Sequence, residues 1–179
     1  FKQNVDRQSL MSSVSMTPYT NGVVKYDWSG YDEVTLNLPE KLRENTTYVL
    51  TFGKDLKTRR AGKLTTPIQI IFSTGSSIDS GSITGSVLLS FQSTSNEINN
   101  NLFVFAYDLT NIADDMLDYS KNKPDFLVQP STDAQFEFRA LKVGKTYSVL
   151  AVSAEYRNKL YVPTVDTFVI KKTIIGLTS

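Results

Sequence analysis

Short runs in which apolar and polar residues alternate recur along the chain, and they constrain its fold more than any other feature. Residues 34, 36 and 38 are apolar, for example, whereas Thr35 and Asn37 between them are polar. Successive side chains of a β-strand point to opposite faces of a sheet, so a period of two predicts strands with one buried face. Comparable runs occupy residues 48–52, 68–72, 83–89, 102–107, 136–138, 147–152 and 168–170.

Turn-forming residues separate these runs, and helical patterns are short. Clusters of Gly, Asn, Ser and Pro lie between runs rich in Val, Thr, Tyr and Phe, which is typical of antiparallel sandwiches and barrels. Residues 39–43 and 112–119 have the composition of single helical turns, and Asn111 is placed to cap the second one. Neither segment is long enough to form a core helix. The sequence therefore predicts an all-β fold.

A polar segment rich in Ser and Gly, residues 73–82, divides the chain of 179 residues. A chain of this length forms one large domain or two small ones, since domains commonly contain about 100–150 residues. We therefore expect two tandem antiparallel β-sandwich domains, at residues 1–76 and 80–179. The second contains a polar stretch, residues 110–133, and loops longer than about 15 residues are usually functional or disordered. We expect this stretch to be a contact surface.

The chain contains neither cysteine nor histidine. Without cysteine it has no disulfide, thiol nucleophile, thiolate metal site or iron–sulfur cluster. Without histidine, Ser-His-Asp and Cys-His mechanisms and the H-E-x-x-H zinc motif are excluded. The glutamates fall mostly at turns or at polar positions of alternating strands, where solvent-facing residues are expected, rather than forming a glycosidase-type pair. We expect no enzymatic activity and no cofactor or metal.

The balance of charge and hydropathy argues against two classes of partner. Nineteen Lys and Arg residues stand against eighteen Asp and Glu residues, which gives a formal net charge of +1. A nucleic-acid-binding domain needs a basic face to displace counterions, so no nucleic-acid partner is expected. No apolar run approaches the roughly 20 residues that span a bilayer, so we expect no direct membrane insertion of this segment.

A resemblance to a known family rests on the segments LRENTTYVLTFGKDLKTRRAGK and IQIIFSTG. They resemble the bacterial Ig-like domain named after the S-layer protein SbsA, in which an L-x-x-n-T-x-Y strand precedes a polar hairpin and an f-x-F-x-T-G strand. VSMTP and EVTLNLPEKL match two earlier strands. The resemblance covers residues 1–76 and implies that Phe1 lies inside an incomplete first edge strand. The matching positions are Leu42, Asn45, Thr46, Tyr48, Leu50, Phe52, Gly62, Ile70, Phe72, Thr74 and Gly75.

Residues 80–172 resemble the small sandwiches of the carboxypeptidase-regulatory or Cna B type. IDSGSITGSV resembles their opening strand, LFVFAYDL resembles a following strand, and AQFEFRALKVGKTYSVLAVS resembles their G-x-F-x-f-x-x-L-x-x-G-x-Y-x-l-x-A hairpin. A tandem of these two domain types implies a secreted or surface protein of a Gram-negative bacterium. The matching positions in the hairpin are Phe136, Phe138, Leu141, Gly144, Tyr147, Val149 and Ala151.

Aromatic residues gather in the stretch PYTNGVVKYDWSGY. Sugar-binding sandwiches stack exposed rings on sugar faces, so Tyr26, Trp28 and Tyr31 form a candidate ligand platform. Trp28 stands beside Gly30 among turn-forming residues, where a ring would be presented at the surface. The alternative, which we favour, is that Trp28 closes the open end of the first sandwich.

The hairpin of the first domain is unusually basic. Lys57, Arg59 and Arg60 are candidate contact residues, and Lys63 follows them. Such a tip can meet an anionic polymer or a neighbouring domain. The alternative is a solvated tip whose charges oppose edge-to-edge aggregation of the sheet.

Two short groups of residues suggest a cation site and a glycan site, and we interpret both as features of turns. Asp114, Asp115 and Asp118 are close enough to share a cation, but calcium takes about six to eight oxygen ligands and the spacing is not that of an EF-hand. Residues 45–47 fit the acceptor pattern for N-linked glycans. Asn45 also suits a turn, and the two threonines that follow suit the start of a strand. We interpret the glycan motif as a chance overlap.

These observations predict a structural or interaction module of an exported bacterial protein. It would act as a spacer or protein-binding scaffold at the cell surface, associated with the outer membrane, or outside the cell. The expected partners are other domains of the parent protein, cell-surface proteins or a polysaccharide. A carbohydrate-binding module that uses the aromatic residues around Trp28 is the alternative. The predicted core residues are Leu36, Tyr48, Leu50, Phe52, Ile70 and Phe72 in the first domain and Val104, Phe136, Phe138, Leu141, Tyr147 and Val149 in the second.

Overall fold

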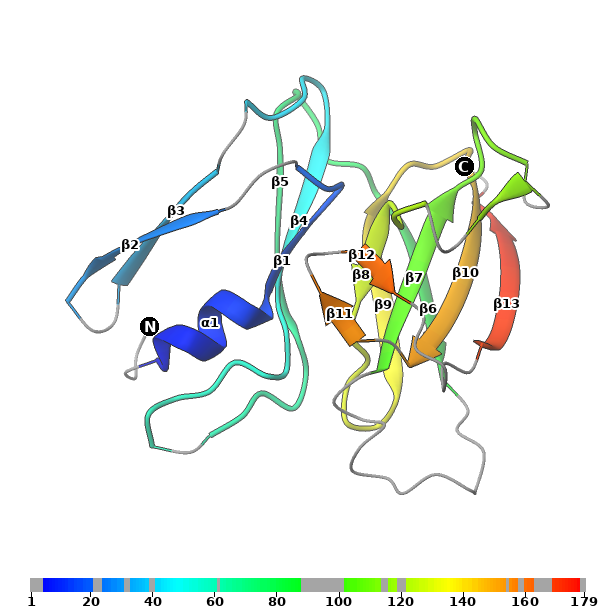
Figure 1. Cartoon of the computed structure of the whole chain (residues 1–179). Helices are drawn as coiled ribbons and strands as arrows, with labels where there is room; N and C mark the ends of the chain where they lie inside the picture. Colours follow the sequence, from blue (N-terminus) through cyan, green and yellow to red (C-terminus); the bar gives the residue numbers. More distant parts are fainter. Residues whose placement is uncertain are drawn as a thin grey trace. The chain divides into compact units, whose positions relative to one another are not determined.

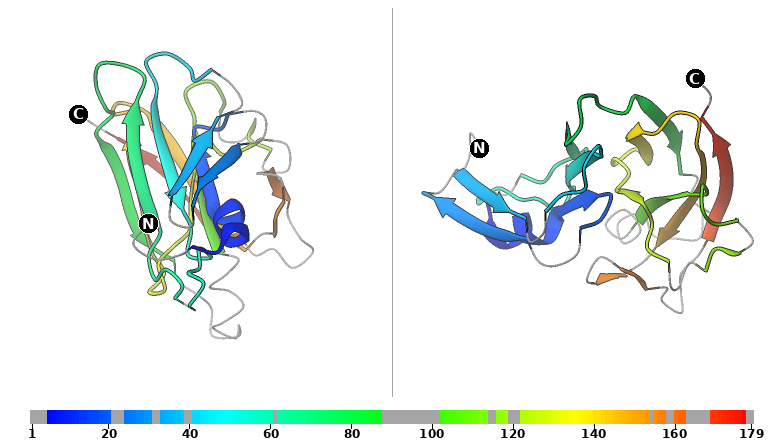
Figure 2. Two further views of the ribbon diagram at one scale, coloured as in Figure 1. Left: turned by 90° about the vertical axis from the view of Figure 1, so that its left-hand side faces the viewer. Right: turned by 90° about the horizontal axis from the view of Figure 1, so that it is seen from above.

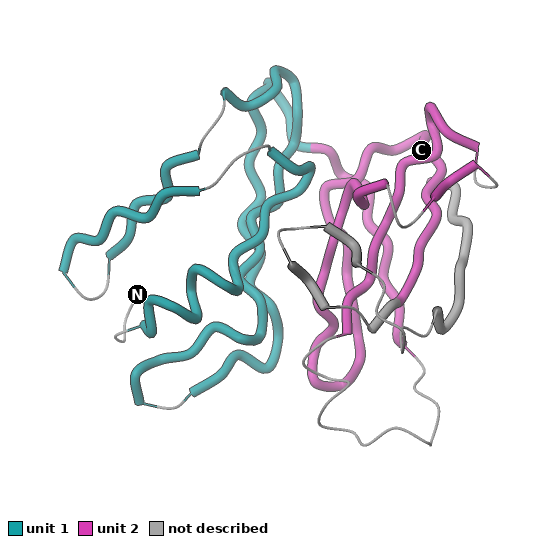
Figure 3. Tube along the Cα trace, viewed as in Figure 1, with its two compact units in different colours: residues 1–78 teal, residues 79–179 magenta. Residues whose placement is uncertain are grey.

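The computed structural model consists mainly of β-strands, and every pairing between them is antiparallel (Figure 1). The prediction of an all-β fold is confirmed. The chain divides into two compact units, Phe1–Ile78 and Asp79–Ser179 (Figure 3). No helix in the described residues is long and apolar enough to cross a membrane. The described residues are 5–20, 24–30, 33–38, 41–60, 62–87, 102–113, 116–118, 122–153, 155–157, 160–162 and 169–177.

Unit 1 contains a 3-stranded sheet in the order β1-β4-β5, a separate β2–β3 hairpin and the helix α1. Figures 1 and 2 show α1 and the hairpin on the same side of this sheet. The first hydrophobic core lies between the sheet and these two elements. The elements are α1 (Arg7–Ser13), β1 (Val14–Thr17), β2 (Lys25–Ser29), β3 (Glu33–Asn37), β4 (Thr47–Phe52) and β5 (Ile68–Ser73).

Alternation along the strands builds this core. Val14 of β1 lies opposite Phe52 of β4, and both side chains are buried in the core. Leu50 and Leu36, which the sequence also places in the core, are partly buried and pack against it. Tyr48 is fully buried and stacks on Phe72, with 5.6 Å between the ring centroids. The buried members of the cluster are Val5, Leu10, Val14, Phe52 and Leu56.

The prediction that Ile70 belongs to the core is wrong, because its side chain is 50% exposed. Ile70 lies opposite Leu50, so it does share the core-facing side of the sheet. In the described residues, however, β5 is the last strand of the sheet, and the core cluster takes no residue from it. Ile68, on the same face, is 49% exposed. Alternation gives the face of a side chain but not whether another element covers it.

The helix α1 precedes β1 in the chain. Phe1, expected to lie inside an incomplete edge strand, is outside the described residues. Asp6 caps α1, since the Asp6 carboxylate accepts a hydrogen bond from the Ser9 backbone N–H at 2.8 Å. Leu10 is fully buried and anchors the helix on the first core. Because α1 has 7 residues and Leu10 is its one buried apolar residue, its sequence shows no helical periodicity. The described parts of the two segments expected to be helical contain no α-helix.

Unit 2 contains a 4-stranded sheet in the order β13-β10-β7-β8, a β6–β9 pair and a β11–β12 pair. A core between the 4-stranded sheet and the β6–β9 pair contains all the predicted residues of the second domain, with Phe136 partly buried against it. The strands are β6 (Gly81–Ser86), β7 (Leu102–Asp108), β8 (Phe126–Val128), β9 (Gln135–Leu141), β10 (Thr146–Ser153), β11 (Glu155–Arg157), β12 (Leu160–Val162) and β13 (Val169–Gly176).

The 4-stranded sheet is covered on both faces. Along β7, Val104 contributes to the core between the sheets, whereas Phe105 and Tyr107 contribute to a second cluster on the other face. Leu117 is buried in that second cluster, and Ile112 packs against it. The polar stretch at residues 110–133, expected to be a contact loop, thus supplies part of a core as well as the strand β8.

A buried tyrosine near the start of a central strand closes a turn in each unit. The hydroxyl of Tyr48 accepts a hydrogen bond from the backbone N–H of Arg43 at 2.9 Å. The hydroxyl of Tyr147 accepts one from the backbone N–H of Lys142 at 3.1 Å. Both tyrosines are fully buried. These contacts, each to the residue five positions upstream, are tyrosine corners of the kind found in immunoglobulin-like sandwiches.

The two corners also share sequence and backbone conformation. Residues 42–48 and 141–147 both read Leu-x-x-(Asn/Gly)-x-Thr-Tyr. The fourth residue has positive φ in both, 49° at Asn45 and 79° at Gly144. Glycine and asparagine are the residues that adopt this left-handed conformation most readily. The turn therefore explains Asn45 without a glycan.

Candidate functional site

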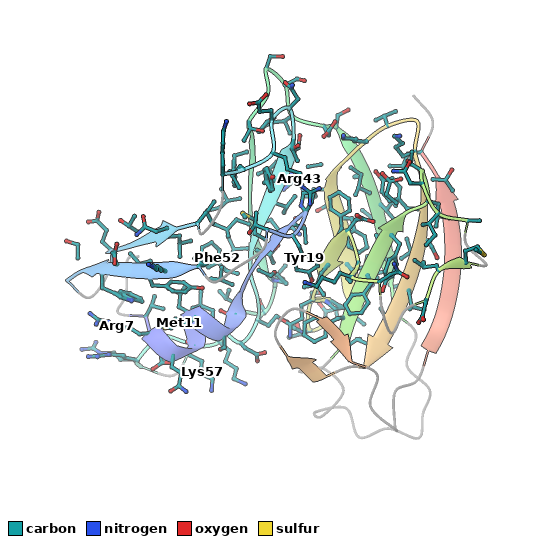
Figure 4. The ribbon with its side chains drawn as sticks, turned by 45° about the horizontal axis from the view of Figure 1, so that its top comes forward. Arg7, Met11, Tyr19, Arg43, Phe52 and Lys57 are labelled. Carbon is teal, nitrogen blue, oxygen red and sulfur yellow. The ribbon has the colours of Figure 1, made fainter. Side chains whose placement is uncertain are left out.

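The start of α1 connects the two regions of unit 1 that the sequence singles out as candidate contact sites. The backbone N–H of Asp6 donates a hydrogen bond to the carbonyl of Lys57 in the basic hairpin, at 2.9 Å. The guanidinium of Arg7 donates one to the carbonyl of Gly30, in the turn after β2, also at 2.9 Å. Figure 4 shows Arg7 and Lys57 at this end of the unit.

Trp28 lies in strand β2, not in a turn as the sequence suggested. It is opposite Val34 of β3, is partly buried, and packs against the first core. The guanidinium carbon of Arg7 lies 4.7 Å from the ring centroid, which is a cation–π contact. Arg7 therefore covers one face of the ring on which a sugar would stack. This arrangement favours the interpretation in which Trp28 closes the core.

The other two residues of the candidate platform differ in their positions. Tyr26 is two residues before Trp28 on the same strand and also packs against the first core. Its burial raises the pKa of its hydroxyl above the ordinary value. Tyr31 lies outside the described residues. The structure therefore brings Tyr26 and Trp28 together on the core side of the β2–β3 hairpin, and the platform stays a prediction.

The basic hairpin is closed by short-range hydrogen bonds. The backbone N–H of Thr58 donates to the carbonyl of Gly62 at 3.0 Å, and the Thr58 hydroxyl accepts from the N–H of Gly62 at 3.2 Å. Lys57 and Lys63 form an isolated antiparallel bridge at its base. All of its charged residues are exposed. Together with Arg7 they form what we call the basic surface, which comprises Arg7, Lys57, Arg59, Arg60 and Lys63.

The basic surface is locally rich in positive charge although the chain as a whole is nearly neutral. Residues 54–63 contain five basic residues and one acidic residue, Asp55. Asp6, the nearest acid on α1, accepts the capping hydrogen bond of the helix. Sequence reasoning identified the hairpin but missed Arg7, because its position depends on α1. The capping residue Asp6 was the available signal for that helix.

Lys54 precedes the hairpin but does not belong to the exposed surface. Its side chain is buried, with 6% exposure. Burial lowers the pKa of its amine, and the nearby carboxylate of Asp55 partly opposes this shift. The positive charge presented to solvent at this end of unit 1 therefore comes from the other residues of the hairpin and from Arg7.

Two carboxylates of unit 2, those of Asp108 and Asp125, accept hydrogen bonds from the backbone. Asp125 accepts a hydrogen bond from the Asp108 backbone N–H at 2.7 Å, and Asp108 accepts one from that of Thr110 at 2.8 Å. The described residues contain no group of three or more acidic side chains that could hold a metal ion. Asp114 and Asp115 lie outside the described residues, so the acidic turn stays a prediction.

Tyr147 is the group whose ionisation is most strongly perturbed among the described residues. Burial, and to a lesser degree the negative charges of Asp108, Asp125 and Asp79, together raise the pKa of its hydroxyl to about 12. The hydrogen bond at Lys142 acts in the opposite direction. A tyrosine that holds its proton this tightly is a structural hydrogen-bonding group and is poorly suited to act as a base near neutral pH.

Comparison with known protein families gives a match to the first unit. Residues 1–74 match the family model of the bacterial Ig-like domain. Searches of curated proteins and of solved structures returned no match. The match covers the 3-stranded sheet, the β2–β3 hairpin, α1 and the basic surface. It supports an Ig-like domain as the identity of unit 1.

Proposed function

We propose that the chain is a non-catalytic structural or interaction module of an exported bacterial protein, where it acts as a spacer or a protein-binding scaffold. The observation that carries this proposal is that each unit encloses a hydrophobic core of its own and begins a central strand with a tyrosine corner. Bacterial Ig-like domains are commonly structural modules of surface proteins, which supports the same role for unit 1.

In this proposal unit 2 is a second sandwich, of the carboxypeptidase-regulatory or Cna B type. Its β6–β9 pair and its 4-stranded sheet enclose one core, as the resemblance implies. The strands β9 and β10 carry the aromatic positions of the hairpin motif, and Gly144 lies in the turn between them. The partners would be other domains of the parent protein or proteins of the cell surface.

A spacer has to resist extension, so the mechanical test is stretching of the whole chain by its ends. The antiparallel ladders of each unit should break in separate events. Complete extension should release about 27 nm for unit 1 and about 34 nm for unit 2, less the folded end-to-end distances, because each residue spans about 3.4 Å. Gradual extension without discrete events would contradict the proposal of two load-bearing modules.

The location of the protein is tested on intact cells of the source bacterium. An antibody against the 179-residue chain should detect a protein that added protease degrades without cell lysis, while a cytoplasmic marker stays intact. Protection of the chain until the cells are broken would exclude exposure at the cell surface. Cross-linking on the same cells, followed by mass spectrometry, identifies the neighbouring proteins.

A further inference from the structure

The hairpin of unit 1 holds two lysines directly opposite one another. Lys57 and Lys63 form an antiparallel bridge, so their side chains project from the same face of the ladder. Both are exposed. Like charges at directly opposed positions destabilise a strand pair. The stability of the hairpin therefore does not explain this pair, whereas a bound anionic group would relieve the repulsion between the two charges.

The backbone that carries these charges is held in place before any partner arrives. The carbonyl of Lys57 accepts a hydrogen bond from the N–H of Asp6, and the N–H of Lys57 donates one to the hydroxyl of Ser9, both at 2.9 Å. Across the hairpin, Thr58 and Gly62 are joined by two hydrogen bonds. A surface organised in advance loses less conformational freedom when it binds.

We propose that the basic surface binds an acidic polysaccharide, that is, a glycan that carries carboxylate or sulfate groups. Four exposed basic residues in residues 57–63 face no carboxylate within that segment, and Arg7 adds a further cation from α1. Exposed residues next to this surface along the chain, Gln8, Thr65 and Thr66, are polar and can hydrogen-bond to sugar hydroxyls. This inference does not rest on the spacer role.

Two other anionic partners fit the same surface less well. Peripheral binding to membranes combines cations with apolar side chains that enter the bilayer, and Met11 is the large apolar side chain that α1 exposes. Binding of single-stranded nucleic acid relies on aromatic rings on which bases stack. Trp28, the ring next to this surface, is covered by Arg7. A single exposed apolar side chain on α1 and a ring whose face is covered are few anchors for either partner, which favours a flexible, hydroxyl-rich polyanion.

The test measures binding of the full chain to heparin, a sulfated polysaccharide used as the probe. A triple variant reverses three charges of the basic surface, and a control variant reverses three exposed lysines elsewhere with the same change in net charge. A cation near an anionic surface contributes roughly fivefold in affinity, so the first variant should bind about 100-fold more weakly. The control should change little, because salt screens distant charges beyond about 8 Å. The variants are Lys57→Glu/Arg60→Glu/Lys63→Glu and, as control, Lys25→Glu/Lys41→Glu/Lys142→Glu.

A single substitution separates loss of binding from loss of folding. Lys63→Glu places an acid opposite Lys57, so it should raise the melting temperature of unit 1 while it weakens heparin binding. Equal heparin affinities of the triple variant and its control would overturn the proposal. Tighter binding of the unmodified chain to anionic phospholipid vesicles or to single-stranded DNA than to heparin would also overturn it, in favour of those partners.

Discussion

Removing one oxygen atom from each tyrosine corner tests how much these turns stabilise the two units. Tyr147→Phe and Tyr48→Phe keep the buried ring and delete only the hydroxyl. In unit 2 the backbone N–H of Lys142 then loses the acceptor that lies 3.1 Å away. In unit 1 the N–H of Arg43 loses an acceptor at 2.9 Å.

The expected cost follows from the burial of the groups involved. Tyr147 and Tyr48 are both fully buried. The donors are backbone N–H groups of Arg43 and Lys142 in part-buried hydrogen bonds, and the loss of such a bond costs about 1 kcal/mol. For units of this size, 1 kcal/mol shifts the melting temperature by about 4–8 °C. We therefore expect each substitution to lower the melting temperature of its own unit by at least about 4 °C and to leave the other transition in place.

Alkaline pH provides an independent measurement for unit 2. The pKa of Tyr147 is raised from the ordinary value of 10.0 to about 12, so the folded state holds this proton more tightly than the unfolded state. The stability from this effect is fully present below pH 10.0 and is lost as the pH rises through about 12. Two pKa units correspond to about 2–3 kcal/mol at most.

Calorimetry of the whole chain and of each variant, at neutral pH and in a series of alkaline buffers, checks both expectations. Tyr147→Phe should remove the part of the alkaline destabilisation of unit 2 that comes from this group. Tyr48→Phe is the matched control, since it leaves the Tyr147 corner untouched. The reasoning is refuted if both substitutions cost less than about 0.5 kcal/mol, the low end for a hydrogen bond. It is also refuted if Tyr147→Phe leaves the alkaline profile of unit 2 unchanged.

Three further substitutions test other features. Asn45 has a φ of 49°, so Asn45→Ala should destabilise unit 1 by about 1–2 kcal/mol while Asn45→Gly is tolerated, as judged by chemical denaturation. A Cβ on Gly81 would lie 2.6 Å from the carbonyl oxygen of Leu141, so Gly81→Ala should destabilise unit 2 by about 1–3 kcal/mol; an unchanged melting temperature would show that the β6–β9 pair is looser than described. Trp28→Ala should cost unit 1 roughly 2 kcal/mol, less than a fully buried Trp, and should leave retention on neutral polysaccharides unchanged. Loss of that retention in a folded variant would instead support the carbohydrate-binding alternative.

Most of the strands and most of the core were predictable because alternation is a local property. Tyr48 and Tyr147 each begin a period-two run, and both prove fully buried. Ile70 shows the limit of this argument, since it has the right face but no covering element. The alternation of Tyr26 and Trp28 with polar neighbours also indicates the strand β2. The turn-forming residues nearby led instead to the prediction that Trp28 lies in a turn.

Features that depend on contacts between distant segments were not predictable in the same way. The helix α1 is held by Leu10 on a core made mostly by other elements, so its own sequence carries little periodic signal. The position of Arg7 over Trp28 depends on that helix. In residues 110–133, the strand β8 extends the 4-stranded sheet, and Leu117 packs on the outer face of that sheet. Period-two patterns cannot assign a partner to that face. The basic hairpin was predictable because its charges are contiguous in sequence.

The shared corner has a consequence for how such chains are assembled. Each corner comprises its own hydrogen-bond donor, its own left-handed residue and its own tyrosine within seven consecutive positions, residues 42–48 in one unit and 141–147 in the other. These seven residues therefore contain every group that the corner needs to form. The same pattern precedes a central strand in both units, although different residues form the two cores around it.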